Sequence, residues 1–187
     1  MKELNINNKK FDSVLENLLL KRRNKVKSSS VSVINIINDT RRNGDKAVLK
    51  YEKKYSKIKT KSNKIFFSNK EINRIAKKTN IKIRKAIDLA FTRIKKFHIK
   101  KKVSNFKFKD KYNNELSYKY SSIGKVGVYV PGGTASYPST VLMNCIPAIV
   151  AGVKNIYLTT PSLDSKINPA VVYAAKKCGV KKIYKTG

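Results

Sequence analysis

One turn in the chain has the residue types that could bind an anion. Pro131-Gly132-Gly133 follows an apolar stretch, and Thr134 and Ser136 add hydroxyl groups before a predicted helix begins. Adjacent glycines let a backbone approach a ligand closely and expose its N–H groups, and a helix amino terminus favours negative charge. The turn therefore predicts a site for a phosphate or a carboxylate. A plain tight turn is the alternative, because a dinucleotide fingerprint needs a third glycine and a Walker loop needs Gly-Lys-Ser/Thr.

The stretch after Gly124 predicts the element order β-α-β-α-β, which would position this turn. The expected elements are a strand over Val126–Val130 covered on both faces, a helix from Ser139 or Thr140 to Val150 closed by Gly152, a strand over Asn155–Thr160, a helix capped by Asn168 with Pro169 in its first turn and ended by Gly179, and a strand over Val180–Tyr184. This order predicts a parallel, Rossmann-like sheet whose ligands sit beyond the carboxyl ends of the strands. Tyr129 lies at such an end, as a buried aromatic or as a platform for a ligand ring.

The stretch before Gly124 is lysine-rich and predicts a helical segment with a small strand component. The expected elements are a helix over Phe11–Arg22, a helix from Val33 ended by Gly44, a helix capped by Asp45 with Val48, Leu49 and Tyr55 facing inward, a strand over Lys64–Ser68, a helix opened by a Ser68–Glu71 capping box, a helix over Ile81–Lys100 with one apolar face from Ile83 to Phe97, and a hairpin over Phe106–Tyr120 around Asn113-Asn114. The fold class is therefore α/β, with an incomplete parallel sheet.

Residues for metal or acid–base chemistry are sparse. A catalytic zinc needs about three protein ligands, whereas the chain has 1 histidine and 2 cysteines. We interpret His98 as a packed or capping residue at a helix end, and Cys145 and Cys178 as small core residues. No carboxylate pair or Ser/His/Asp arrangement indicates a catalytic centre.

The net charge of +32 allows two interpretations. Clustered cations could bind the phosphate backbone of a nucleic acid. We favour a general lysine bias without a specific nucleic-acid partner, because the lysines are spread along the chain and accompany many Asn and Ile residues. The sequence shows no signal peptide and no apolar run long enough to span a membrane. A cytoplasmic protein is therefore expected.

The stretch Gly127–Asn144 resembles the signature segment of the histidinol dehydrogenases. The resemblance extends upstream to Gly44-Asp45-Lys46-Ala47-Val48 and Phe97-His98. It extends downstream through Ile146-Pro147-Ala148, Ala151-Gly152-Val153, Thr159-Thr160-Pro161, Asn168-Pro169-Ala170-Val171 and Cys178-Gly179-Val180. The sequence departs from the family at Ser121-Ser122, where a proline and an aliphatic residue are usual.

The resemblance implies a zinc-dependent homodimer that oxidises L-histidinol to L-histidine in two NAD-dependent steps. It implies an arm over residues 1–30, the first half of one domain over 31–125, and the first part of a second, NAD-binding Rossmann-like domain over 126–187. The resemblance also implies that Tyr129 binds the cofactor and that Gly132 and Gly133 form the loop beside it.

The family's zinc ligands and catalytic residues are expected beyond Gly187. The resemblance therefore implies an amino-terminal fragment that is inactive by itself. Two other functions stay open from the residues alone: a basic nucleic-acid-binding module, and a different α/β nucleotide-binding protein that shares only the glycine turn.

Overall fold

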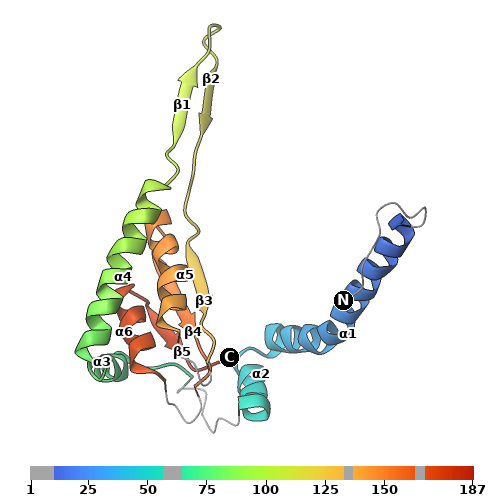
Figure 1. The fold of residues 1–187 in the computed structure, drawn as a ribbon, viewed down its shortest axis with the longest axis vertical. Coiled ribbons are helices and arrows are strands. Elements are labelled where there is room, and N and C mark those ends of the chain that lie inside the picture. The colour runs from blue at the N-terminus through green and yellow to red at the C-terminus, as the bar shows by residue number, and fades with distance from the viewer. Residues whose placement is uncertain (1–10, 57–64, 133–136, 163–166) are drawn as a thin grey trace. The chain divides into compact units, whose positions relative to one another are not determined.

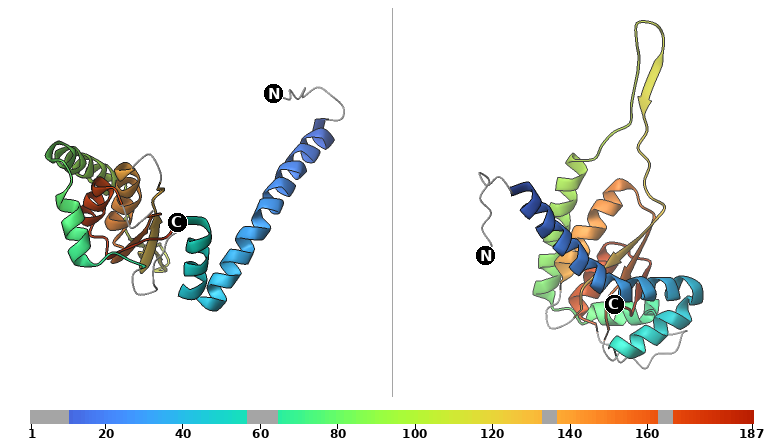
Figure 2. Two further views of the ribbon diagram at one scale, coloured as in Figure 1. Left: turned by 90° about the horizontal axis from the view of Figure 1, so that it is seen from below. Right: turned by 90° about the vertical axis from the view of Figure 1, so that its right-hand side faces the viewer.

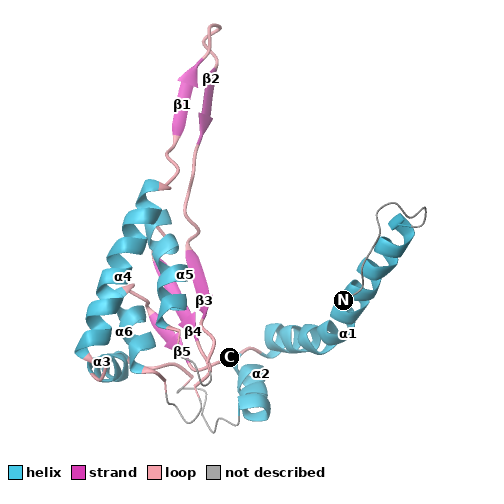
Figure 3. Ribbon diagram, in the orientation of Figure 1, coloured by secondary structure: helices cyan, strands magenta, loops and turns pink. Residues whose placement is uncertain are grey.

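The computed structural model describes residues 11–56, 65–132, 137–162 and 167–187, apart from the side chains of residues 20–30. It divides into two compact units, Met1–Tyr51 and Glu52–Gly187. The elements, shown in Figure 3, are α1 (Phe11–Asn43), α2 (Asp45–Tyr51), a π-helical turn (Glu52–Ser56), α3 (Asn69–Lys77), α4 (Ile81–Lys100), β1 (Phe106–Lys109), β2 (Glu115–Tyr118), β3 (Lys125–Tyr129), α5 (Pro138–Ala151), β4 (Asn155–Thr159), α6 (Pro169–Lys177) and β5 (Lys182–Tyr184). The α/β class is confirmed, whereas the domain boundaries at 30 and 125 stay predictions.

The described part of the first unit consists of two helices joined at a glycine. Gly44 has φ 53° and its N–H donates to the carbonyl of Thr40 at 2.8 Å, so it ends α1 as predicted. Asp39 then links the two helices, because its carboxylate accepts from Lys50 Nζ at 2.9 Å and from the Tyr51 hydroxyl at 2.8 Å. These hydrogen bonds hold the pKa of Asp39 well below its usual range.

Two expectations for the helices of residues 11–56 are wrong. We predicted separate helices over Phe11–Arg22 and from Val33, but α1 runs unbroken through both. No glycine or proline lies between them, so local sequence gives the helix no reason to stop. Tyr55 was expected to face inward and is instead 60% exposed.

The second unit has a parallel sheet of three strands in the order β3-β4-β5. Residue Val126 pairs with Ile156, and Leu158 pairs with Ile183. The β-α-β-α-β prediction is therefore confirmed in type and order, with each strand slightly shorter than expected or shifted by one residue. The predicted strand over Lys64–Ser68 is reduced to one antiparallel bridge between Phe66 and Tyr184, while Lys64 lies outside the described residues.

The described helices of this unit lie on one face of the sheet. Figure 2, in its left view, shows α5 and α6 against the strands and α3 and α4 outside them. The core lies between the strands and α5 and α6, and its largest fully buried side chains include Val130, Val141, Cys145, Ile146, Leu158, Val172 and Ile183. The expectation that Val126–Val130 is covered on both faces is wrong, because Tyr129 on the other face is 52% exposed.

Only part of the apolar face of α4 is buried. Ile87 is buried and Ile94 is half-buried, but Ile83 and Phe97 remain exposed although the helical period places them on the same stripe. The expectation of a continuous inward face is therefore wrong at both ends of α4. The neighbouring helices α5 and α6 are shorter than α4, with 14 and 9 residues against its 20, so they do not cover its whole length.

The predicted hairpin of β1 and β2 is confirmed and extends away from the helical layers (Figure 1). Asn113 takes the positive φ of 68° that the turn requires. Asp110 fixes the turn by accepting from the backbone N–H groups of Tyr112 and Asn114 at 2.8 and 2.9 Å. Both strands are exposed along their whole length.

Candidate functional site

The turns after β3 and β4 lie side by side at the carboxyl edge of the sheet. The N–H of Val130 donates to the carbonyl of Thr159 at 2.9 Å, and the N–H of Thr160 donates to the carbonyl of Tyr184 at 3.1 Å. These bonds continue the parallel pairing just beyond the strands. The edge where ligands bind in open α/β sheets is therefore formed by adjoining backbone segments.

Gly132 is held tightly against the second of these turns. A Cβ at this position would lie 3.0 Å from the Pro161 Cβ and 3.1 Å from the Pro161 carbonyl oxygen. The close approach to Pro161 is thus one reason for glycine at this position, whereas the predicted approach to a ligand stays a prediction. Gly133, the other predicted residue of the loop, lies outside the described residues.

Tyr129 lies at the end of β3 on the sheet face that the helices leave open. Its side chain is 52% exposed, whereas Val128 beside it is buried against the helices. The interpretation of Tyr129 as a buried aromatic is therefore wrong, and its role as a platform for a ligand ring stays a prediction. An exposed ring at a strand end is available to stack on a planar ligand group.

The amino end of α5 follows the glycine turn, and none of the described side chains caps it. Its N-cap residue is Tyr137, with Pro138 in the first turn, so the expectation that Ser139 or Thr140 caps this helix is wrong. Proline at this place starts the helix early because its φ already suits a helix and its missing N–H is not needed there. The remaining N–H groups of the first turn keep the partial positive charge that attracts anions.

A buried carboxylate, which the sequence did not predict, lies near the end of β5. Glu52 is 7% exposed, and one of its oxygens accepts from the N–H of Gly187 at 3.0 Å. Its other oxygen, like the Ser162 hydroxyl, has no partner among the described residues. Glu52 sits in a helical run of charged residues, so no sequence pattern separates it from solvent-exposed neighbours.

The three residues considered for metal binding do not form one group, because His98 lies apart from the two cysteines. His98 is half-buried in the last turn of α4, with its ring edge-on to Phe97 at a centroid distance of 5.3 Å. Cys145 and Cys178 are buried core residues whose thiols hydrogen-bond to each other. That bond and burial raise the pKa of Cys178, which keeps it a neutral thiol.

Within the described ranges, no three or more His, Cys, Asp or Glu side chains are grouped so as to hold a metal ion. In the same part of the chain, no helix is long and apolar enough to cross a membrane.

Comparisons with known proteins agree on one family. The sequence model of histidinol dehydrogenase matches residues 19–187. The chain is 54% identical over 187 residues to the histidinol dehydrogenase of Pelagibacter ubique, which covers all of this chain and 43% of that protein. It is 36% identical over 177 residues to that of Caulobacter vibrioides, covering 95% of this chain and 41% of that protein.

A solved structure shares the fold as well. The crystal structure of histidinol dehydrogenase from Elizabethkingia anophelis superposes with a TM-score of 0.79 at 36% identity, over 84% of this chain and 36% of that one. The chain therefore spans less than half the length of the relatives that it matches.

Proposed function

Because this chain belongs to the histidinol dehydrogenase family, we propose that it is the amino-terminal part of an enzyme that oxidises L-histidinol to L-histidine in two NAD-dependent steps. The family match over residues 19–187 supports the activity. The geometry at the sheet edge supports the cofactor. We further propose that the complete enzyme is a cytoplasmic homodimer of histidine biosynthesis.

The single observation that carries the cofactor proposal is the position of Tyr129. Its exposed ring stands at the carboxyl end of β3, beside the turn where Gly132 packs against Pro161. In this proposal Tyr129 stacks on a planar ring of NAD, while Gly132 and Gly133 keep the turn free of side chains. The amino end of α5, which no described side chain caps, favours the negative charge of the cofactor's diphosphate. When bound, NAD supplies the hydride acceptor for each oxidation.

The described residues do not fit a zinc site, because they bring no three ligating side chains together. We therefore derive no catalytic step through zinc from this chain. We assign the zinc ligands and the catalytic acid–base groups of the proposed enzyme to residues outside 1–187. The chain alone should hold NAD weakly and should not turn over L-histidinol.

A titration of the purified chain with NAD⁺ tests the cofactor proposal. Tyr129→Ala should weaken binding about tenfold or more, since stacking of a base on an aromatic ring contributes about 1–3 kcal/mol. Tyr112→Ala is the matched control, because Tyr112 is also exposed, at 73%, but lies at the tip of the hairpin. Equal loss in both variants, or no binding to the unaltered chain at millimolar NAD⁺, would contradict the proposal.

The expected inactivity of the chain has its own test. The chain is incubated with L-histidinol, NAD⁺ and zinc, and NADH absorbance is followed. We expect no steady increase above a reaction without protein. Sustained NADH production that depends on L-histidinol would show that the catalytic groups lie within residues 1–187.

A further inference from the structure

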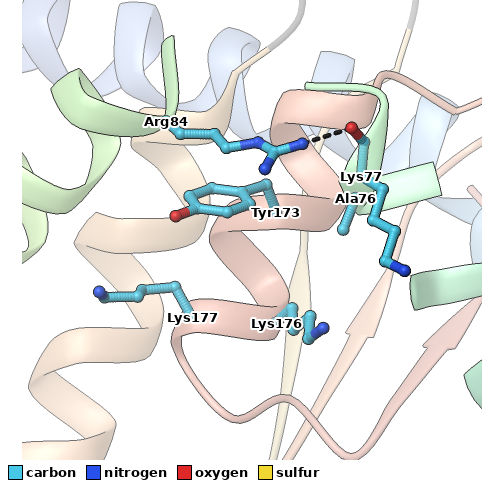
Figure 4. A pocket seen from close by; sticks show the side chains of 6 residues that line it. All are labelled: Ala76, Lys77, Arg84, Tyr173, Lys176 and Lys177. Atoms are coloured by element: carbon cyan, nitrogen blue, oxygen red, sulfur yellow. Dashed lines mark hydrogen bonds between the residues drawn. The ribbon is translucent and has the colours of Figure 1, made fainter. Parts of the chain in front are cut away.

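A hollow lies on the helical side of the sheet, where three helices meet. It has a volume of about 400 Å³ and is shown in Figure 4. It is lined by residues of α3, α4 and α6, namely Ala76, Lys77, Arg84, Tyr173, Lys176 and Lys177. Four of these six side chains are cationic and none is acidic. The hollow is thus separate from the candidate site at the sheet edge and differs from it in chemistry.

Arg84 forms a fixed wall of this hollow. Its Nε donates to the carbonyl of Thr79 at 2.9 Å, and a second guanidinium nitrogen donates to the carbonyl of Lys77. The guanidinium also lies over the Tyr173 ring, 5.6 Å from its centroid (Figure 4). Only part of the five N–H donors of the guanidinium is used in these bonds. An arginine whose guanidinium is held in place and still has unused N–H donors is suited to bind phosphate.

One of the four cations is neutralised and three are not. Asp88 accepts from Lys177 Nζ at 2.9 Å and from the Tyr173 hydroxyl at 3.0 Å, so it compensates the charge of Lys177. Among the described residues, Lys77, Arg84 and Lys176 have no carboxylate within the 4.0 Å of an ion pair. Three positive charges around one hollow repel each other, and a multivalent anion would relieve that repulsion.

We propose that this α3–α4–α6 hollow binds the phosphate or diphosphate group of a small phosphorylated molecule. The arginine supplies directed hydrogen bonds, and Lys77 and Lys176 supply two mobile charges at the rim. The volume lies at the lower end of the roughly 300–1,000 Å³ typical of small-molecule sites. The rival explanation is structural: Lys77 and Lys176 lie in the last turns of α3 and α6, where cations favour the helix ends.

Pyrophosphate binding to the 187-residue chain separates these explanations. The test variant carries Lys77→Met and Lys176→Met, which keep the aliphatic stems and remove two charges. The control carries Lys109→Met and Lys119→Met, two exposed hairpin residues, so both variants lower the net charge from +32 to +30. By calorimetry at fixed ionic strength, we expect the first pair to weaken binding about tenfold or more and the control pair by less than about twofold. Equal losses, or no binding to the unaltered chain, would overturn the proposal.

A second measurement does not depend on the fold of a variant. When pyrophosphate is titrated into the isotope-labelled chain, the amide resonances around Arg84 and Tyr173 should shift at lower pyrophosphate concentrations than those of other residues. Shifts spread evenly over the lysine-rich surface, or centred on the amino end of α5, would contradict a site in this hollow. Glucose 6-phosphate should compete with pyrophosphate, because the phosphate group carries the contacts. Failure to compete would restrict the hollow to inorganic anions and overturn the assignment to phosphorylated molecules.

Discussion

The two faces of the parallel sheet differ in what they do for the molecule. On the helical face, Ile156, Leu158 and Ile183 are between 1% and 3% exposed and form the core. On the open face, Tyr129 is exposed and Tyr157 and Tyr184 are half-buried. The same strands contribute both sets, because alternate residues of a strand point to opposite faces. Stability is therefore concentrated on one face, while the candidate cofactor residue lies on the other.

Aromatic rings meet on the open face. Tyr157 and Tyr184 meet edge to face at a centroid distance of 6.5 Å, and Phe66 meets Tyr184 at 6.1 Å. Tyrosine tolerates half exposure because its ring is apolar and its hydroxyl can remain in water. A strand whose sequence is a continuous apolar run can therefore still pack only one of its two faces against a core.

Neighbouring residues of β4 give the sharpest test of this difference. Leu158→Ala should lower the free energy of unfolding by about 2–5 kcal/mol, because it leaves a cavity in a packed core. Tyr157→Ala should cost about 1 kcal/mol, because it removes mainly ring contacts on the open face. Urea unfolding of both variants measures the two costs. Equal costs would show that the open face is packed in solution.

Two glycines allow a similar test at the sheet edge. Gly132→Ala places a Cβ 3.0 Å from Pro161, so it should cost about 1–3 kcal/mol through overpacking and should also weaken NAD⁺ binding. Gly127→Ala is the control, since nothing lies within 4 Å of a Cβ there. Thermal melts and NAD⁺ titrations should separate the two variants. If Gly132→Ala behaves like Gly127→Ala, the close approach of the two turns is not required.

A substitution at the start of the outer helix α3 should lower the free energy of unfolding less. Local hydrogen bonds, rather than contacts with the sheet, define where α3 begins. The predicted capping box is present: Ser68 Oγ accepts from the N–H of Glu71 at 3.3 Å, and the Glu71 carboxylate accepts from the N–H of Ser68 at 2.8 Å. Ser68→Ala should cost about 1 kcal/mol in urea unfolding. Exposed Ser117 in the hairpin provides the control, and a comparable cost for Ser117→Ala would contradict a specific capping effect.

The smallest effect expected is a pH dependence at the same cap. Hydrogen bonds from the Ser68 backbone and hydroxyl hold the pKa of Glu71 below its ordinary value of 4.5. A lowered folded pKa means that this stabilisation is fully present above about pH 4.5 and is lost as the pH falls through the folded pKa. Glu71→Gln should therefore be less stable than the unaltered chain near pH 6, and the gap should narrow in acid. A gap independent of pH would show that the carboxylate charge is not involved.

The sequence predicted the elements whose causes are local. The end of α1 at Gly44, the capping box at Ser68 and the end of α5 at Gly152, with φ 92°, each depend on residues within a few positions of one another. The β-α-β-α-β order was predictable for the same reason, since strand-length apolar runs and capped helices alternate along the chain. Ser121-Ser122, the departure from the family, was harder to interpret. Here the Ser122 hydroxyl donates to the carbonyl of Gly152 at 3.1 Å and links the chain before β3 to the end of α5.

What the sequence by itself determined is therefore the identity and order of the elements and the place of Tyr129 at a strand end. Only the tertiary structure decided which face of the sheet is covered, that Gly132 approaches Pro161, and that Glu52 is buried near Gly187. It also decided that Arg84 of α4 lines one hollow together with Tyr173 and Lys176 of α6. The physical reason is range: φ preferences and caps act between neighbours in sequence, whereas burial and close approach depend on segments that are far apart in the chain.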